Sequence, residues 1–359
     1  MTVLQRNTNA ASVTFENVTK VYGRDVVAVD NISLSVEAGT LVTLLGPSGC
    51  GKTTTLRMIA GLEMVTSGRI LIGNADVTRL PATDRDVSMV FQSYALFPHM
   101  SVLENVSYGL KFSGFPKAEV RDRALAGLEL VGLKDYGARL PSELSGGQQQ
   151  RVAVARALVL EPQVLLFDEP LSNLDAKLRR QVREDIRDIQ TRLGLTAVYV
   201  THDQEEALAV SDRIIVMNRA VIAQEGTPRD LYDAPASRFV ADFIGEANIF
   251  PCEIVKVEGG RASVRIGDFS ADLPARDFAP GPAYLAVRPN RIRLVAGGTQ
   301  NAIPGELRKA TYAGSHLEFF VETPHGPIFA VDDDVNATLA PGTSVGITFT
   351  EPGPVLVHD

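Results

Sequence analysis

A glycine-rich segment, Gly46-Pro-Ser-Gly-Cys-Gly-Lys-Thr53, follows a short apolar run and precedes a stretch with helical spacing. Its pattern is G-x-x-x-x-G-K-[ST], in which glycines let successive backbone N–H groups curl around phosphate oxygens. The positive end of the following helix adds to this attraction. We expect Lys52 to reach the β- and γ-phosphates of a nucleotide and the Thr53 hydroxyl to bind Mg²⁺. A chance glycine-rich turn is the alternative, and the strand-loop-helix context disfavours it.

An acidic pair, Asp168-Glu169, ends a second apolar run, Val164–Phe167. A carboxylate at the end of a strand beside the loop can hold Mg²⁺ directly or through water, which is the role we predict for Asp168. Glu169 is then placed to polarise the attacking water as a general base. Alone, such a pair is more often a solvated strand end or a helix cap, so this interpretation depends on the loop.

A third segment, Leu144-Ser-Gly-Gly-Gln148, opens a predicted helix over 149–160. The residues Ser145, Gly146, Gly147 and Gln148 would form a second anion-binding helix N-terminus. Two such helix ends are hard to explain with one nucleotide in one chain. Ser145 acting only as a helix N-cap is the alternative, which leaves that duplication unexplained.

The elements that must position these residues follow an α/β pattern. Buried-strand runs at 41–45, 164–167 and 197–201 alternate with helical stretches, which indicates a largely parallel sheet. Helical periodicity dominates an insert over about 93–158. After about Arg238, short alternating stretches separated by Gly and Pro turns predict a small all-β barrel or sandwich, with a domain boundary near 235–245. We therefore predict an α/β domain that contains a helical insert, followed by a separate all-β domain.

Composition limits the partners. Hydrophobic residues make up 45% and charged residues 22% of the 359, and the net charge of −8 disfavours a nucleic-acid partner. The two cysteines, Cys50 and Cys252, form no disulfide framework or metal spacing and suit a reducing compartment. The N-terminus has no secretory pattern, and no apolar run reaches the roughly 18 residues of a membrane helix. We expect a cytoplasmic chain whose partners supply any membrane span.

Taken together and in this order, the motifs from about Val13 to Phe243 resemble the ATP-binding subunit of an ATP-binding-cassette (ABC) transporter. The resemblance implies that Tyr22 stacks on adenine and that the loop residues hold ATP. It also assigns Gln92, in Val90-Phe-Gln-Ser93, to sensing Mg²⁺ and the attacking water, and His202 to the γ-phosphate. The implied nucleotide-binding residues of the loop are Gly46, Pro47, Ser48, Gly49, Cys50, Gly51, Lys52, Thr53 and Thr54.

The resemblance further implies a head-to-tail homodimer, in which Ser145–Gln148 of one chain cap the ATP held by Lys52 of the other. Asp175, in Ser172-Asn-Leu-Asp175, belongs to the same nucleotide site, and the chain departs from the family only slightly at Asn173, where Ala is common. Singly, each of these residues has an ordinary structural explanation. Their order and spacing carry the assignment.

The resemblance implies two membrane permease subunits and, through them, an extracellular solute-binding protein. The chain would then sit peripherally at the cytoplasmic face of a bacterial inner membrane. We expect Tyr94, Leu96 and Phe97 to line the groove that receives a permease helix. The alternative is that these side chains pack into the core of the helical insert.

The β-domain resembles the C-terminal transport-associated module of importers. The resemblance implies a P-loop NTPase core, the ABC ATPase domain, over 1–238 with its helical insert over about 93–158, and an OB-like β-domain over 239–359. Ala286-Val-Arg-Pro289 and Tyr312-Ala-Gly-Ser315 fit importers of polyamines, aminoethylphosphonate, opines or ferric iron, with polyamines such as putrescine or spermidine as the first expectation and sugars less favoured. Cassette ATPases of DNA repair need a long coiled-coil insert, and translation-type proteins carry two cassettes, so both are disfavoured. A nucleotide sensor without turnover is disfavoured by the presence of Glu169 and His202.

Overall fold

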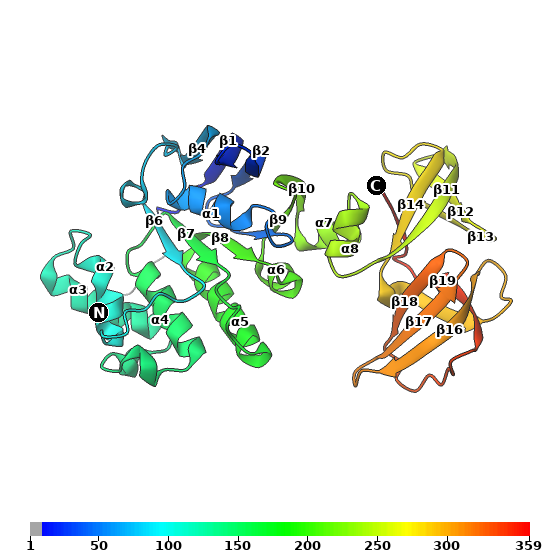
Figure 1. The fold of residues 1–359 in the computed structure, drawn as a ribbon. Helices are drawn as coiled ribbons and strands as arrows, with labels where there is room; N and C mark the ends of the chain where they lie inside the picture. The colour runs from blue at the N-terminus through cyan, green and yellow to red at the C-terminus, as the bar shows by residue number, and fades with distance from the viewer. Residues whose placement is uncertain (1–8) are drawn as a thin grey trace. The chain divides into compact units, whose positions relative to one another are not determined.

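The computed structural model describes residues 9–359, which divide into two compact units between Pro228 and Arg229 (Figure 1). The predicted domain bounds, 1–238 and 239–359, stay a prediction. The short helices α7 (Pro228–Asp233) and α8 (Arg238–Phe243) are tied into the second unit, because the guanidinium of Arg288 donates hydrogen bonds to the carbonyls of Tyr232 and Ala241.

The first unit is built on a six-stranded sheet of order β10-β9-β3-β8-β7-β6, in which the edge strand β10 is antiparallel and the other neighbours are parallel. Its strands are β3 (Leu41–Leu45), β6 (Val87–Val90), β7 (Val164–Asp168), β8 (Thr196–Thr201), β9 (Arg213–Asn218) and β10 (Val221–Gly226). Every residue of β3, β7 and β8 is buried, which confirms the strands predicted from the apolar runs.

A smaller antiparallel sheet of order β2-β1-β4-β5 packs on one face of this sheet, with α1 (Lys52–Ala60) between them in the same core. Its strands are β1 (Val13–Tyr22), β2 (Val26–Val36), β4 (Ser67–Ile72) and β5 (Ala75–Asp76). Because side chains alternate along a strand, Leu166 and Val198 face this core while Phe167 and Tyr199 face the other.

The second face meets the helical insert. The insert contains α2 (Val102–Leu110), α3 (Lys117–Leu130) and α4 (Gly146–Leu158), with 3-10 turns at 134–136 and 141–143. Outside the insert, the first unit also contains α5 (Ala176–Leu193), α6 (Gln204–Val210) and a 3-10 turn at 82–84. Figure 1 shows α2, α3 and α4 grouped together beside β6. Their apolar faces share one core with α5 and the sheet, so the insert is packed onto the α/β unit. Within residues 9–359, no helix is both long and apolar enough to span a membrane.

The second unit consists of two five-stranded antiparallel sheets around a common core. One has the order β13-β12-β11-β14-β20 and the other β15-β19-β16-β17-β18, with a 3-10 turn at Pro289–Arg291. The strands are β11 (Asn248–Glu258), β12 (Arg261–Ile266), β13 (Phe269–Pro274), β14 (Gly281–Val287), β15 (Ile292–Ala296), β16 (Ile303–Tyr312), β17 (Leu317–Thr323), β18 (Gly326–Asp332), β19 (Ser344–Phe349) and β20 (Val355–Val357). The prediction of an all-β unit after the α/β core is confirmed.

Candidate active site

The glycine-rich loop lies between β3 and α1, as its pattern predicts. A Cβ atom added to Gly46 would lie 2.2 Å from the backbone oxygen of Met217, and one added to Gly51 would lie 2.4 Å from that of Ala28. Gly51 also has a positive φ of 107°. The loop therefore needs glycine at these two positions to pass the neighbouring backbone.

The N-terminus of α1 is left open to an anion. Gly51 is its N-cap, no side chain caps it, and its first turn contains no acidic residue. Lys52 folds back over the loop, where its Nζ donates to the carbonyl oxygens of Gly46 at 2.7 Å and Pro47 at 2.9 Å. Ser48 and Gly49 are exposed at the tip, while Cys50 is buried. This arrangement fits a phosphate-bearing ligand, because free N–H groups, the helix dipole and an ammonium group converge.

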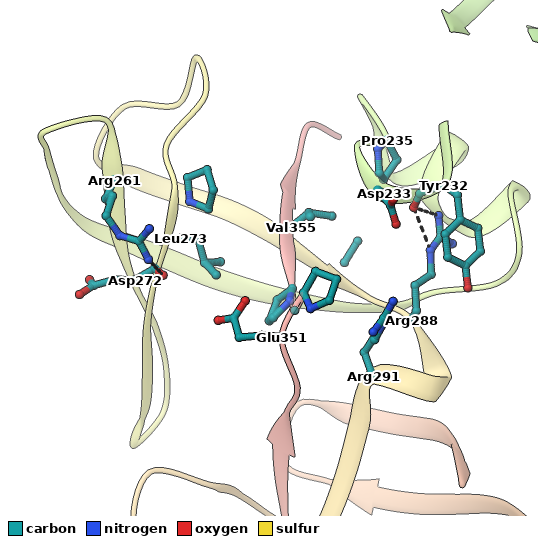
Figure 2. A pocket seen from close by; sticks show the side chains of 15 residues that line it. Tyr232, Asp233, Pro235, Arg261, Asp272, Leu273, Arg288, Arg291, Glu351 and Val355 are labelled. Atoms are coloured by element: carbon teal, nitrogen blue, oxygen red, sulfur yellow. Dashed lines mark hydrogen bonds between the residues drawn. The ribbon is translucent and has the colours of Figure 1, made fainter. Parts of the chain in front are cut away.

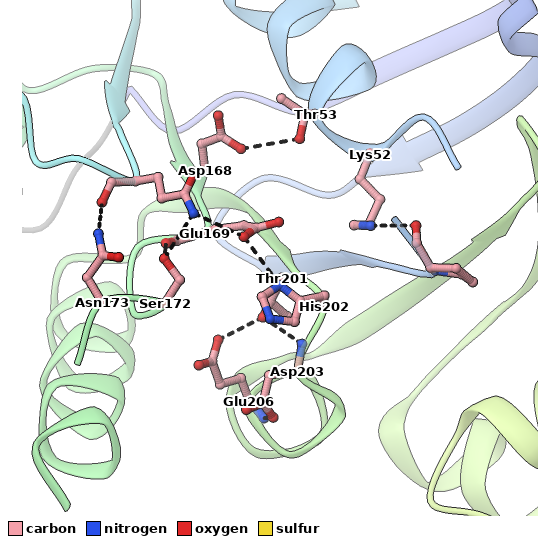
Figure 3. A network of polar contacts seen from close by, with 12 residues as sticks. Lys52, Thr53, Asp168, Glu169, Ser172, Asn173, Thr201, His202, Asp203 and Glu206 are labelled. Atoms are coloured by element: carbon pink, nitrogen blue, oxygen red, sulfur yellow. Dashed lines mark hydrogen bonds and ion pairs between the residues drawn. The ribbon is translucent and has the colours of Figure 1, made fainter. Parts of the chain in front are cut away.

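Thr53 and Asp168 meet across the site. The Thr53 hydroxyl lies 3.5 Å from Asp168 Oδ1, and Thr54 follows in the same helix (Figure 3). Burial raises the pKa of the Asp168 carboxyl. Arg57 lowers this pKa, the neighbouring Glu169 raises it, and the Thr53 hydrogen bond lowers it. A hydroxyl and a carboxylate are oxygen ligands of the kind Mg²⁺ prefers, so these residues fit that ion.

Glu169 holds the centre of a polar network. Its Oε2 lies 3.2 Å from His202 Nδ1 and 3.5 Å from Gln92 Nε2 (Figure 3). Its backbone has a positive φ of 45°, and its N–H donates to the carbonyl of Val200 on β8. Non-glycine residues rarely adopt this conformation, and they cluster at functional sites. Three residues predicted from separate segments are thus brought together.

Two residues that sequence reasoning did not assign hold Gln92 in place. Gln92 Nε2 lies 3.2 Å from the Ser172 hydroxyl, and the Asn173 side chain donates to the Gln92 carbonyl at 3.0 Å. Asn173, treated as a minor departure from the family, therefore ties the segment after β6 to the segment after β7. The signal available in the sequence was a polar side chain in the turn that follows Asp168 and Glu169.

A buried network supports the turn that carries His202. Thr201 donates its hydroxyl to Glu206 Oε2 at 2.8 Å and accepts a hydrogen bond from the Asp203 N–H at 3.0 Å. Tyr199 also donates to Glu206, at 3.1 Å. Burial raises the pKa of the Glu206 carboxyl. Thr201, Asp203 and Glu206 line a cavity of about 40 Å³, which Glu169 and His202 also line.

The segment Ser145–Gln148 begins α4. Gln148 N–H donates to the Ser145 hydroxyl and the Ser145 N–H donates to the Gln148 side chain, so the pair forms a capping box. Gly147 lets α4 approach α5, because a Cβ there would lie 2.7 Å from Leu178. Ser145 is exposed. Within residues 9–359, no hydrogen bond or ion pair joins this segment, including Gly146, to the loop at 46–54.

Tyr22 and Asp175 lie outside the network around Glu169. Tyr22 is 36% exposed, and the Lys20 ammonium lies over its ring, 4.7 Å from the centroid, so only part of the ring is open for stacking. Asp175 caps α5 by accepting a hydrogen bond from the Leu178 N–H at 3.0 Å. The structure thus gives Asp175 a structural role and leaves its predicted contact with nucleotide as a prediction.

The three apolar side chains expected in a partner groove divide between surface and core. Tyr94 is 7% exposed and packs, with Leu96, against the core of the insert. Phe97 is half-buried, and its ring lies 4.6 Å from that of Tyr108. The expectation is therefore wrong for Tyr94, because the insert core has room for its ring. Leu96 and Phe97 are only partly buried, so part of each side chain remains exposed to solvent.

Comparison with protein-family models finds the ABC transporter model over residues 29–172 and the TOBE domain model over residues 285–356. The "Fe(3+) ions import ATP-binding protein FbpC" of Brucella abortus (strain 2308) is 63% identical over 349 residues, covering 97% of this chain and 98% of that protein. The protein of the same name in Agrobacterium fabrum (strain C58 / ATCC 33970) is 61% identical over 346 residues, which cover 96% of this chain and 98% of that protein.

A more distant relative, "Fe(3+) ions import ATP-binding protein FbpC 1" of Haemophilus influenzae, is 51% identical over 87% of this chain and 94% of its own. Among solved structures, the ATP-binding cassette MJ0796, a dimer in a post-hydrolysis state bound to ADP and Pi, matches with a TM-score of 0.54 and 35% identity. That match covers 60% of this chain and 99% of the cassette. The chain is an ATPase and belongs to the family of ABC-importer ATP-binding subunits that carry a C-terminal TOBE domain.

Proposed function

We propose that this chain hydrolyses Mg·ATP to drive the import of ferric iron through separate membrane subunits. The single observation that carries the hydrolytic part is the position of Glu169, whose carboxylate lies between His202 and Gln92 and directly follows Asp168. For the solute, the relatives described above are named for Fe(3+) import. They favour ferric iron, an alternative in the sequence analysis, over the polyamine expected first.

The nucleotide is held by the loop. The phosphates would take the N–H groups at the start of α1, and Lys52 would exchange its carbonyl contacts for phosphate oxygens. Thr53 and Asp168 would hold Mg²⁺, which neutralises charge on the phosphates when bound. Tyr22 would stack on the adenine ring through its exposed face.

The hydrolytic step falls to Glu169. Its carboxylate accepts a proton from the water that attacks the γ-phosphate, and Gln92 orients that water. His202, with Nδ1 against Glu169, directs its ring toward the developing negative charge on the phosphate. The hydrogen bonds of Thr201 with Glu206 and Asp203 fix the turn that carries His202, and so the position of His202 relative to Glu169.

We further propose a head-to-tail homodimer, because Ser145 is exposed and its segment has no bond to the loop of its own chain. The dimeric cassette reported above supports this proposal. In such a dimer Ser145, Gly146, Gly147 and Gln148 cap the nucleotide of the partner. Two permease subunits and an extracellular binding protein complete the transporter, with this chain at the cytoplasmic face of the inner membrane.

Reconstitution tests the solute. The chain is purified with its permease subunits, placed in lipid vesicles, and supplied with the binding protein loaded with ferric iron or mixed with putrescine or spermidine. We expect the ferric form to stimulate ATP hydrolysis and the polyamines to have no effect. Stimulation by a polyamine and not by ferric iron would refute the solute assignment while leaving the ATPase assignment intact.

A further inference from the structure

One arginine of the first unit connects two segments of the active site that are far apart in the sequence. Arg179 lies in the first turn of α5, the helix that Asp175 caps. Its Nη1 donates to Asp203 Oδ2 at 3.1 Å, and its Nη2 donates to the carbonyl oxygen of Leu174, also at 3.1 Å. A planar guanidinium donates in fixed directions, so the two bonds hold these segments at a set separation.

The first of these two anchors, Leu174, is fixed by packing. It is 6% exposed, and its side chain belongs to the core that the helical insert shares with the sheet. It follows Ser172 and Asn173, the two residues that hold Gln92 in place. Arg179 therefore binds the segment on the Gln92 side of the site, at a point that the core holds still.

The second anchor, Asp203, belongs to the turn that carries His202. Both carboxylate oxygens of Asp203 accept hydrogen bonds, Oδ2 from Arg179 and Oδ1 from the N–H of Glu206 at 3.1 Å. The Glu206 carboxylate also faces the guanidinium, with its Oε1 3.7 Å from Arg179 Nε. Two carboxylates of one turn therefore attract the same guanidinium, which ties that turn to α5.

The ring of His202 depends on this turn for its position. Its Nδ1 lies 3.2 Å from Glu169 Oε2 (Figure 3), but the side chain is 59% exposed, so packing alone does not hold it. Arg179 lines the cavity of about 40 Å³ that Glu169 and His202 also line. The guanidinium thus borders the residues proposed for hydrolysis, and it holds the turn from which the His202 ring projects.

We propose that Arg179 is a positioning residue for ATP hydrolysis and that it acts through His202. Its guanidinium holds Asp203, and with it the His202 ring, at a fixed distance from the segment that ends at Leu174. Without the guanidinium the turn keeps its buried hydrogen bonds around Glu206 but loses this tie to the Gln92 side of the site. The inference rests on the proposed function, in which His202 acts in hydrolysis.

Steady-state ATP hydrolysis and equilibrium ATP binding by the full chain separate positioning from folding. Arg179→Gln should lower kcat about tenfold or more while ATP affinity stays within about twofold of the wild type, because a shift of about 1 Å near the reacting atoms costs about a hundredfold. Both are measured at a temperature at which the variant is fully folded. Arg179→Lys keeps the charge beside Glu206 without the planar fork, so it should stay folded where Arg179→Gln does not and still lose kcat.

Two control variants remove a guanidinium elsewhere. Arg192→Gln changes an exposed residue in the last turn of the same helix and should leave kcat unchanged. Arg288→Gln removes a buried guanidinium of the second unit, which donates to the carbonyl of Tyr232 (Figure 2) and to that of Ala241. It should lower the melting temperature without changing kcat, which shows that lost stability alone does not lower turnover.

A double-mutant cycle with His202→Ala tests whether Arg179 acts through His202. In the His202→Ala background, Arg179→Gln should change kcat by less than about twofold, because the group that it positions is gone. An equal factor in both backgrounds, or a kcat of Arg179→Gln that matches that of Arg192→Gln, would overturn the inference and leave the proposed function intact. If His202→Ala alone hydrolyses ATP at the wild-type rate, the proposed role of His202 fails, and the inference fails with it.

Discussion

The buried carboxylate of Glu206 supports the turn that carries His202, so replacing Glu206 with alanine should lower both stability and turnover. Glu206 is 3% exposed and accepts hydrogen bonds from the hydroxyls of Tyr199 and Thr201. Those two residues are themselves 1% and 2% exposed. The Thr201 hydroxyl in turn accepts the N–H of Asp203, so one carboxylate fixes the whole turn.

The size of the effect follows from these contacts. Glu206→Ala leaves two buried hydroxyls without their acceptor, at about 1–3 kcal/mol each, or roughly 2–6 kcal/mol together. For a unit of this size each kcal/mol shifts the melting temperature by about 2–4 °C, which predicts a fall of roughly 5–20 °C. A displacement of His202 by about 1 Å would lower kcat about a hundredfold.

Thermal unfolding and steady-state ATP hydrolysis measure the two effects. Glu205→Ala is the matched control, because Glu205 lies beside Glu206 in the first turn of α6 and is exposed. Glu206→Gln retains an oxygen acceptor and should recover most of the stability and turnover. The reasoning is refuted if Glu205→Ala and Glu206→Ala unfold at the same temperature. A lower melting temperature with unchanged kcat would show that Glu206 does not position His202.

Three further predictions concern the same unit. Because burial raises the pKa of Glu206, ionising its carboxyl in the fold costs stability, so the stability of Glu206→Gln relative to the wild type should increase in urea unfolding as the pH rises above the ordinary pKa of a glutamate carboxyl. A difference that does not change with pH would contradict this. Gly46→Ala should reduce ATP affinity more than Gly49→Ala in equilibrium binding. A Cβ at Gly46 meets the Met217 backbone, whereas at Gly49 only the positive φ of 80° opposes alanine and nothing lies within 4 Å. A larger loss for Gly49→Ala would count against the loop geometry. Ser145→Ala should lower kcat about tenfold or more with ATP affinity unchanged, and parallel losses of both would argue against its action on the partner's nucleotide.

The sheet and the glycine-rich loop were predictable because local signals and tertiary structure agree there. The runs at 41–45 and 164–167 are apolar since both faces of β3 and β7 are covered, and the loop pattern fixes its own backbone. Glu169 could be selected from its place after a strand end, whereas Gln92 and His202 were assigned through the family resemblance. The distances between them required the structure.

Other features depend on packing that one sequence does not display. Tyr94 has an apolar ring in a loop, and only the insert core decides that it is buried. Glu206 looks like any charged residue in a first helical turn until Tyr199 and Thr201 are seen to face it. Arg288 belonged to a short motif used to choose a solute, whereas its guanidinium holds α7 and α8 to the β-domain. The short motifs of the β-domain favoured polyamines first, whereas the names of the relatives support ferric iron, which was an alternative in the sequence analysis.

The most direct test of the account is the rate of Mg·ATP hydrolysis by Glu169→Gln, measured together with its affinity for ATP. The Gln side chain keeps the shape and the neighbours of Glu169 but cannot accept the proton of the attacking water. We predict that kcat falls about 10²–10⁴-fold while ATP affinity stays within about twofold of the wild type. A variant that hydrolyses ATP within about tenfold of the wild-type rate would show that Glu169 is not the general base.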